Sequence, residues 1–180
     1  MVNRHGPLRG FRVGVTAARR REEQVSLLER RGAEVTCASV VRTAPLTDDS
    51  DLLAVTRGCL RRPPDVVLAT TGVGFRGWFE AADGWGLGEE LTQALGGAEV
   101  YARGAKTVGA IRAAGLREAW SAPTETFDEL LGHVLDRGVR SRRVVLQEHG
   151  ESLASGVAAL RAAGARVEVV TVYRCENAPD

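Results

Sequence analysis

Segments with the pattern of β-strands alternate with segments with the pattern of α-helices along the whole chain. The predicted strands are 11–15, 34–41, 65–70, 99–102, 118–122, 143–147 and 166–173, and the predicted helices are 19–31, 51–61, 75–82, 89–95, 105–114, 125–137 and 152–163. Four of these helices end at a glycine, a residue that readily adopts the left-handed conformation of a helix C-terminus. Because helices are the usual crossovers between parallel strands, the alternation predicts a doubly wound α/β fold with a parallel sheet of four or five strands.

Two segments far apart in the chain resemble each other. Residues 28–35 read LERRGAEV and residues 160–167 read LRAAGARV, and each continues through a predicted strand towards a proline, Pro45 or Pro179. One interpretation is that any two turns from a helix through a glycine to a strand look alike. The other is that two similar domains are present and that both strands pass from one domain to the other.

The second interpretation predicts the domain boundaries. Residues 1–41 would begin an outer α/β domain, residues 42–46 would link it to a complete middle domain of residues 47–170, and residues 171–180 would return as a linker strand. The remainder of the outer domain would then be absent from this chain. Because residues 11–41 would leave sheet faces uncovered, we expect self-association through the incomplete outer domain.

The composition excludes several classes of protein. Hydrophobic residues make up 44% of the chain and charged residues 26%, and the formal net charge is +1. This balance disfavours nucleic-acid binding by this portion, because binders of the phosphate backbone usually concentrate basic residues. The three cysteines form no CxxC pair, so neither a disulfide framework nor a metal site is expected. No apolar run approaches a membrane span and no signal peptide is evident, so we expect a cytoplasmic protein away from membranes.

The stretch Val66–Glu80 reads VVLATTGVGFRGWFE and joins a strand to a helix through a glycine-spaced turn. In open parallel sheets ligands bind beyond the carboxyl ends of the strands, so this turn is expected to form one wall of a small-molecule site. Gly72, Gly74 and Gly77 also satisfy the spacing of a dinucleotide-binding fingerprint. An NAD-binding enzyme is nevertheless disfavoured, since the next strand has its acidic residue, Glu99, at its beginning rather than at its end.

Four motifs, in this order and spacing, resemble the uroporphyrinogen-III synthase (HemD-like) family. They are LLERRGAEVTCASVVRTAP at 27–45, DVVLATTGVGF at 65–75, AEVYARGAKTVGAIRAAG at 98–115 and RRVVLQEHGESLASGVAALRAAGARVEVVTVYR at 142–174. The resemblance implies two flavodoxin-like α/β domains with parallel sheets, joined by a two-stranded linker, with the substrate in the cleft between them. The outer domain would be incomplete in this chain.

The resemblance also implies an activity. Family members convert the linear tetrapyrrole hydroxymethylbilane into uroporphyrinogen III, with loss of water, ring closure and inversion of the last pyrrole ring, and use no cofactor. Some actinobacterial relatives carry a response-regulator-like DNA-binding domain after the synthase-like part. The alternative is therefore a tetrapyrrole- or anion-sensing module of a transcriptional regulator. For this 180-residue chain alone, we expect no synthase activity.

Tyr173 matches the family's cleft tyrosine, which implies the catalytic role. A phenol can donate a proton or a hydrogen bond to the leaving oxygen, although a tyrosine that only packs at a domain junction is the alternative. Thr107 matches the family's threonine at a helix start, where a hydroxyl and free amides would bind a substrate carboxylate, unless it is only a cap. Lys106 would add positive charge for the same carboxylate.

The remaining candidate substrate contacts depart from the family pattern or lie in loops. Thr70, Thr71 and the loop through Arg76 stand where the family usually has a Thr-Ser pair followed by a small or basic residue. The candidate contacts in this stretch are Thr71, Gly72, Val73 and Gly74. Thr16 is followed by Ala17 where the family commonly has arginine. Arg19 or Arg20 is the candidate to replace that charge, and the alternative is an ordinary exposed arginine of the first helical turn. His149 follows a predicted strand and is expected to face the cleft, where a histidine can titrate near neutral pH.

Overall fold

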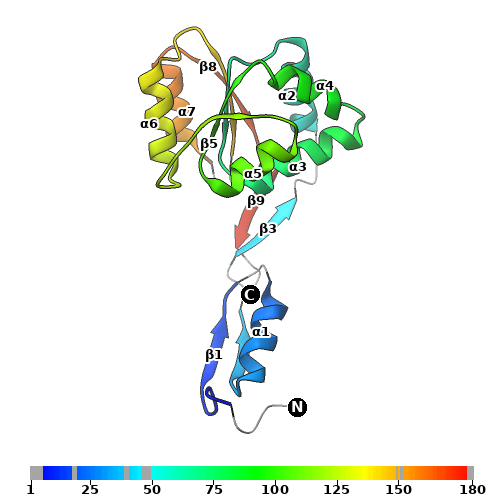
Figure 1. The fold of residues 1–180 in the computed structure, drawn as a ribbon, viewed down its shortest axis with the longest axis vertical. Coiled ribbons are helices and arrows are strands. Elements are labelled where there is room, and N and C mark those ends of the chain that lie inside the picture. Colours follow the sequence, from blue (N-terminus) through cyan, green and yellow to red (C-terminus); the bar gives the residue numbers. More distant parts are fainter. Residues whose placement is uncertain are drawn as a thin grey trace. The chain divides into compact units, whose positions relative to one another are not determined.

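The computed structural model describes residues 6–17, 20–38, 41–45, 50–148, 150 and 152–177. The chain divides into two compact units (Figure 1). The smaller unit comprises Met1–Ala44 with Cys175–Asp180, and the larger unit comprises Pro45–Arg174. Each unit has its own sheet, so the two are described separately.

The larger unit is built on a five-stranded parallel sheet, which confirms the predicted α/β class. In spatial order the strands are β6 (Glu118–Ser121), β5 (Glu99–Ala102), β4 (Val66–Ala69), β7 (Arg143–Gln147) and β8 (Arg166–Val170). The central strand β4 is buried along its whole length. Val67 and Ala69 pack into the hydrophobic cluster on one face of the sheet, while Val66 and Leu68 pack into the cluster on the other face.

Six described helices cover the two faces of this sheet. They are α2 (Ser50–Arg61), α3 (Gly72–Gly84), α4 (Gly88–Leu95), α5 (Ala105–Ala113), α6 (Phe127–Arg137) and α7 (Ala154–Ala162). Helices α6 and α7 lie on one face and α2 to α5 on the other (Figure 1). The layering follows from the two-sided burial of the strands, because a parallel sheet needs apolar cover on both faces.

The glycines predicted to end helices adopt the expected conformation. The φ angles are 93° at Gly32, 76° at Gly115, 84° at Gly138 and 90° at Gly164. A side chain is disfavoured in this left-handed region, so glycine at these points lets the chain turn from each helix towards the next strand.

Two predicted strands end earlier than the sequence suggests. The predicted strand 34–41 is instead β2 (Glu34–Cys37), which stops where its parallel partner β1 (Arg12–Val15) ends at Val15. A separate strand, β3 (Val41–Pro45), pairs with β9 (Tyr173–Asn177) in a two-stranded sheet. The predicted strand 166–173 is likewise divided, since β8 ends at Val170.

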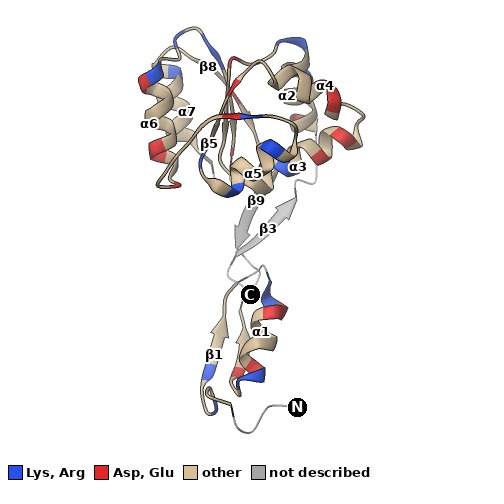
Figure 2. Cartoon of the chain, viewed as in Figure 1, with Lys and Arg blue, Asp and Glu red and all other residues tan. Residues whose placement is uncertain are grey.

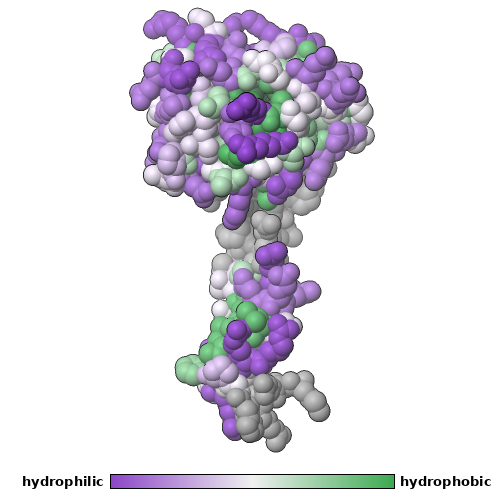
Figure 3. All heavy atoms as spheres, viewed as in Figure 1, coloured by the Kyte–Doolittle hydropathy of each residue, from purple (hydrophilic) through white to green (hydrophobic). Residues whose placement is uncertain are grey.

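The smaller unit buries few of its described residues. Helix α1 (Arg21–Arg30) connects β1 to β2, carries charges of both signs and buries none of its residues (Figure 2). Phe11 and Leu27 are 61% and 44% exposed, and green hydrophobic residues lie at the surface of this unit (Figure 3). The self-association expected from the sequence stays a prediction.

Candidate functional site

The turn after β4 differs from the glycine-spaced loop that the sequence suggests, because helix α3 begins at Gly72. Thr71 is the N-cap: its backbone is extended, and its hydroxyl accepts a hydrogen bond of 3.1 Å from the Gly74 amide. A threonine hydroxyl at this position satisfies one of the amides that the first helical turn leaves without an intrahelical partner. The three glycines of the predicted turn therefore lie inside a helix.

Close packing explains why these positions are glycines. A Cβ atom at Gly72 would lie 2.4 Å from the Lys106 carbonyl oxygen, and one at Gly74 would lie 2.2 Å from Nε2 of Gln147. A Cβ atom at Gly77 would lie 2.8 Å from a methyl carbon of Val172. The spacing that resembles a dinucleotide fingerprint thus serves to seat α3 against its neighbours rather than to form a loop around a phosphate.

Gln147 is the residue that the sequence reasoning missed. It is fully buried at the carboxyl end of β7, and its Oε1 accepts hydrogen bonds from the amides of Thr70 (3.2 Å) and Thr71 (3.1 Å). The Thr70 hydroxyl donates to the Gln147 carbonyl at 2.7 Å, and Gln147 Nε2 donates to the Glu148 carbonyl. The available signal was a glutamine that directly follows three apolar residues of a strand, because a buried polar side chain requires partners.

Tyr173 and Thr71 lie together although 102 positions separate them in the chain. The Tyr173 hydroxyl lies 3.3 Å from the Thr71 hydroxyl, and either oxygen can be the donor. Both side chains are half-buried. Because Gln147 holds the Thr71 backbone, it also fixes the hydroxyl that faces Tyr173.

The start of α3 adds donors beside this pair of hydroxyls. Within the part of the chain that the structure describes, the amides of Gly72 and Val73 donate no hydrogen bond. Val73 is 41% exposed, whereas Gly72 and Gly74 of the same turn are buried, so this turn is open to solvent only on the side of Val73. Free amides at the positive end of a helix dipole favour an anion, such as a carboxylate.

The start of α5 is arranged differently. Lys106 is exposed, whereas Thr107 is only 3% exposed and its amide donates to the Gly104 carbonyl. The first amide of the helix, that of Ala105, donates to the Glu125 carboxylate at 3.1 Å. A carboxylate of the chain itself therefore occupies a donor at the place where a substrate carboxylate was expected.

The other predicted site residues lie in the smaller unit or outside the described residues. Thr16 is exposed in the smaller unit, directly after β1. Arg19 and His149 lie outside the described residues. Their predicted contacts with a substrate stay predictions.

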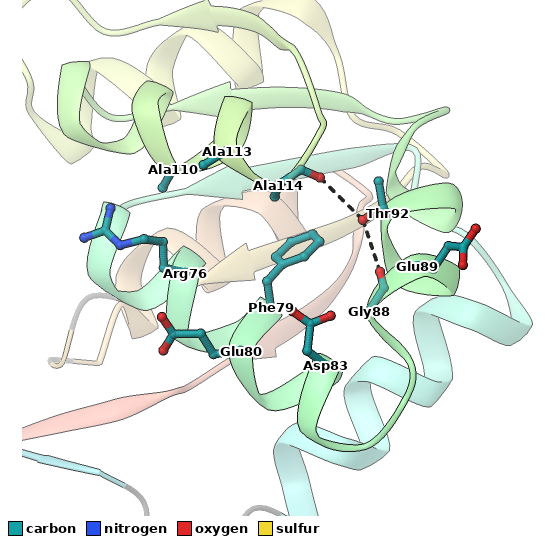
Figure 4. A pocket seen from close by; sticks show the side chains of 10 residues that line it. All are labelled: Arg76, Phe79, Glu80, Asp83, Gly88, Glu89, Thr92, Ala110, Ala113 and Ala114. Atoms are coloured by element: carbon teal, nitrogen blue, oxygen red, sulfur yellow. Dashed lines mark hydrogen bonds between the residues drawn. The ribbon is translucent and has the colours of Figure 1, made fainter.

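A pocket of about 380 Å³ lies between α3, α4 and α5 (Figure 4). Phe79 and three alanines form its apolar part, while Glu80, Asp83 and Glu89 contribute carboxylates and Arg76 a single positive charge. The predominance of negative charge makes it unsuited to an anionic ligand. The candidate site is therefore at Thr71 and Tyr173.

Two features of other site classes were not found among the described residues. No group of three or more His, Cys, Asp or Glu side chains is placed to hold a metal ion. No described helix combines the length and the apolar character that crossing a membrane requires.

Comparison with known proteins decides the family. The model of the family described as Uroporphyrinogen-III synthase HemD matches residues 22–180. The chain belongs to the uroporphyrinogen-III synthase family. The predicted resemblance is thereby confirmed at the level of the family, whereas the fused DNA-binding domain stays a prediction.

Solved structures and a curated relative agree with this membership. A mutant uroporphyrinogen III synthase from the extreme thermophile Thermus thermophilus matches with a TM-score of 0.80 at 30% identity, over 94% of this chain and 64% of that one. The wild-type Thermus enzyme in another crystal form matches with a TM-score of 0.73 at 31% identity, over 94% and 63%. The uncharacterized protein YjjA of Bacillus subtilis is 28% identical over 170 residues, which are 93% of this chain and 62% of YjjA. The chain thus spans less than two thirds of the length of these relatives.

Proposed function

We propose that this chain forms part of a uroporphyrinogen-III synthase, which cyclises hydroxymethylbilane to uroporphyrinogen III with inversion of the last ring and loss of water. The observation that carries the proposal is the Tyr173 hydroxyl at 3.3 Å from the Thr71 hydroxyl, at the carboxyl end of the parallel sheet. Crevices at this end of α/β sheets are where ligands bind. Membership of the synthase family supports the choice of a tetrapyrrole as the ligand.

Tyr173 is the proposed proton donor. The bond between the hydroxymethyl carbon and its oxygen breaks, and the oxygen takes the phenolic proton and leaves as water. The carbon then bonds to the carbon of the last pyrrole ring that already carries the bridge to the preceding ring. That bridge bond breaks and forms again at the other α-carbon of the last ring, which inverts the ring, and this α-carbon loses the proton that restores Tyr173. In the interval the Thr71 hydroxyl, 3.3 Å from the tyrosine oxygen, is placed to donate a hydrogen bond to it.

The start of α3 is the proposed binding point for a substrate carboxylate. The amides of Gly72 and Val73 have no acceptor among the described residues, Val73 is exposed while Gly72 is buried, and the Gly74 amide already donates to the cap hydroxyl. Lys106, exposed at the adjacent start of α5, adds a positive charge, and Thr107 beside it is proposed as a supporting contact. Thr16 and Arg19, from comparison with the family pattern, and His149, from its place after a strand, are further proposed substrate contacts.

The test is an isomer assay on the full-length protein supplied with enzymatically generated hydroxymethylbilane. We expect the type III isomer in excess over the spontaneous type I product, and we expect Tyr173→Phe to lower kcat/KM by about 100-fold. Tyr101→Phe is the matched control, because Tyr101 is the chain's other tyrosine and is buried on β5. An unchanged rate in Tyr173→Phe would contradict the catalytic role. The 180-residue chain assayed alone should form only type I.

A sensor that binds a tetrapyrrole without converting it is the second candidate function. The departures from the family pattern at Ala17 and Gly72 favour it, because they alter two of the expected substrate contacts. A sensor would quench its protein fluorescence with uroporphyrin in a saturable way while forming no type III isomer. Type III formation by the full-length protein would eliminate this candidate.

A further inference from the structure

A second pocket of the larger unit lies at the opposite end of the sheet from the candidate site. Its volume is about 250 Å³, and it is lined by Gly58, Arg61, Arg62, Arg143, Arg166 and Glu168. Arg143 and Arg166 are the first residues of β7 and β8, whereas Gln147 of the candidate site is the last residue of β7. Blue arginine segments are visible at the top of this unit, near α2 and β8 (Figure 2). Four guanidinium groups face one carboxylate here, in a chain whose formal net charge is only +1.

The floor of this pocket is a fixed ion pair. Arg143 is 6% exposed, and its Nη2 donates to both carboxylate oxygens of Glu168, at 2.8 and 2.7 Å. Its Nη1 donates to the Gly58 carbonyl at 3.1 Å. Because Arg143 and Glu168 neutralise each other, the charge of the pocket is set by the remaining arginines.

Gly58 allows the ion pair at the floor of the pocket to pack closely against α2. It lies in the interior of α2, where glycine is a poorer helix former than alanine. A Cβ atom there would lie 3.3 Å from Arg143 Nη2 and 3.4 Å from Glu168 Oε2. The absence of a side chain thus lets the ion pair lie directly against the helix.

The other three arginines have guanidinium N–H groups that donate no hydrogen bond within the described structure. Arg166 donates from Nη2 to the Ser141 carbonyl at 2.9 Å, which leaves most of its guanidinium N–H groups available. Arg61 and Arg62 line the pocket, and neither side chain has a hydrogen-bond or ion-pair partner among the described residues. The negative end of the α2 helix dipole explains a positive charge at Arg61, in the last turn of the helix. It does not explain why all three of these arginines line the same pocket.

We propose that this arginine pocket binds the phosphate group of a small phosphorylated molecule. Guanidinium groups bind phosphate through paired N–H donors, and three uncompensated positive charges suit an ion that carries two or more negative charges. The concave shape and the neutral floor favour a compact ligand over an extended polymer. The proposal does not depend on the synthase activity.

Calorimetric titration of the full-length protein with pyrophosphate tests the proposal, at constant ionic strength. We expect saturable binding with Kd of about 1 mM or tighter, and the double variant Arg61→Gln with Arg62→Gln should weaken it about tenfold or more. Arg57→Gln is the matched control, because Arg57 is an exposed arginine of the same helix that does not line the pocket. Arg166→Gln, on a different element, should weaken binding as well and serves if the double variant does not fold.

Other probes identify the ligand chemistry. Inorganic phosphate that binds as tightly as pyrophosphate would support a site for a single phosphate group, and tighter pyrophosphate would support a diphosphate. The proposal is overturned if no saturable binding is seen, if Arg57→Gln weakens binding as much as the double variant, or if citrate competes equally well. A DNA duplex that binds more tightly than pyrophosphate through the same arginines would also overturn it.

Discussion

Gln147 determines the local geometry of the candidate site, because one side-chain oxygen satisfies the amides of two consecutive threonines. Gln147→Ala leaves both amides without that acceptor in a buried turn, and each unsatisfied donor costs about 1–3 kcal/mol. We therefore expect the free energy of unfolding of the full-length protein to fall by about 2–4 kcal/mol in urea titrations. Gln93→Ala, at an exposed position of α4, should change it by less than about 0.5 kcal/mol. Equal effects of the two substitutions would refute the role of Gln147.

The buried thiol of Cys59 should make the native protein less stable at high pH. Burial raises the pKa of its thiol from 9.0 to about 11, while Arg143 lowers that pKa and Glu168 raises it further. The unfolded chain releases the proton at lower pH than the native protein, so this contribution is complete below about pH 9 and declines as the pH rises towards about 11. The loss should reach about 2–3 kcal/mol. The free energy of unfolding of the wild type and of Cys59→Ala should be measured from about pH 8 to about pH 11, and the wild type should lose more stability over this range. An equal change in both proteins would contradict the prediction.

The sequence identified some of the site residues but not how they are joined. Tyr173 and Thr71 were named separately through the family resemblance, and no local pattern indicates that their hydroxyls lie within 3.3 Å. The Glu125 contact with Ala105 was likewise unpredicted, because it links two elements through a side chain whose backbone adopts φ 56°. Contacts of this kind depend on tertiary packing rather than on residue type.

At the level of elements, helix α3 depends on the absence of a side chain at Gly74. A Cβ atom there would lie 2.2 Å from Gln147 Nε2 and 2.9 Å from Thr71 Oγ1, so Gly74→Ala must displace the turn. We expect it to destabilise the protein by about 1–3 kcal/mol although alanine is the better helix former. Gly132→Ala in α6 is the control, since nothing lies within 4 Å of its added Cβ, and it should stabilise by up to about 1 kcal/mol. Thermal unfolding of both variants checks the opposite signs.

Element types were predictable because apolar periodicity and terminal glycines reflect local physical chemistry. The elements whose limits were wrong are those decided by partners. Strand β2 stops because β1 stops, and α3 starts at Gly72 because Thr71 caps it there. A run of valines or a pair of glycines does not contain that information, so two strands were predicted too long and one helix was predicted to start too late.

For the whole molecule, the two units should differ in local stability. All described residues of α1 are at least partly exposed, whereas every residue of β4 is buried. Amides whose hydrogen bonds lie under little packed apolar surface open with low free energy. We expect native-state hydrogen exchange to be at least about 100-fold faster in α1 and β2 than in β4 and β7. Equal protection in the two units would show that they unfold as one.

The pairing of β4 with β7 has a consequence for synthesis of the chain. A hydrogen bond that involves a side chain joins the two strands at each end. The Arg143 amide donates to the Asp65 carboxylate and the Thr70 hydroxyl donates to the Gln147 carbonyl, between residues 78 and 77 positions apart. At about 5–20 residues per second, the ribosome needs roughly 4–15 seconds to make that intervening stretch. During this interval the edge of the apolar strand β4 that pairs with β7 in the finished fold has no partner strand. Soluble yield on overexpression should therefore depend more on chaperones that hold nascent chains than on the stability of the finished fold.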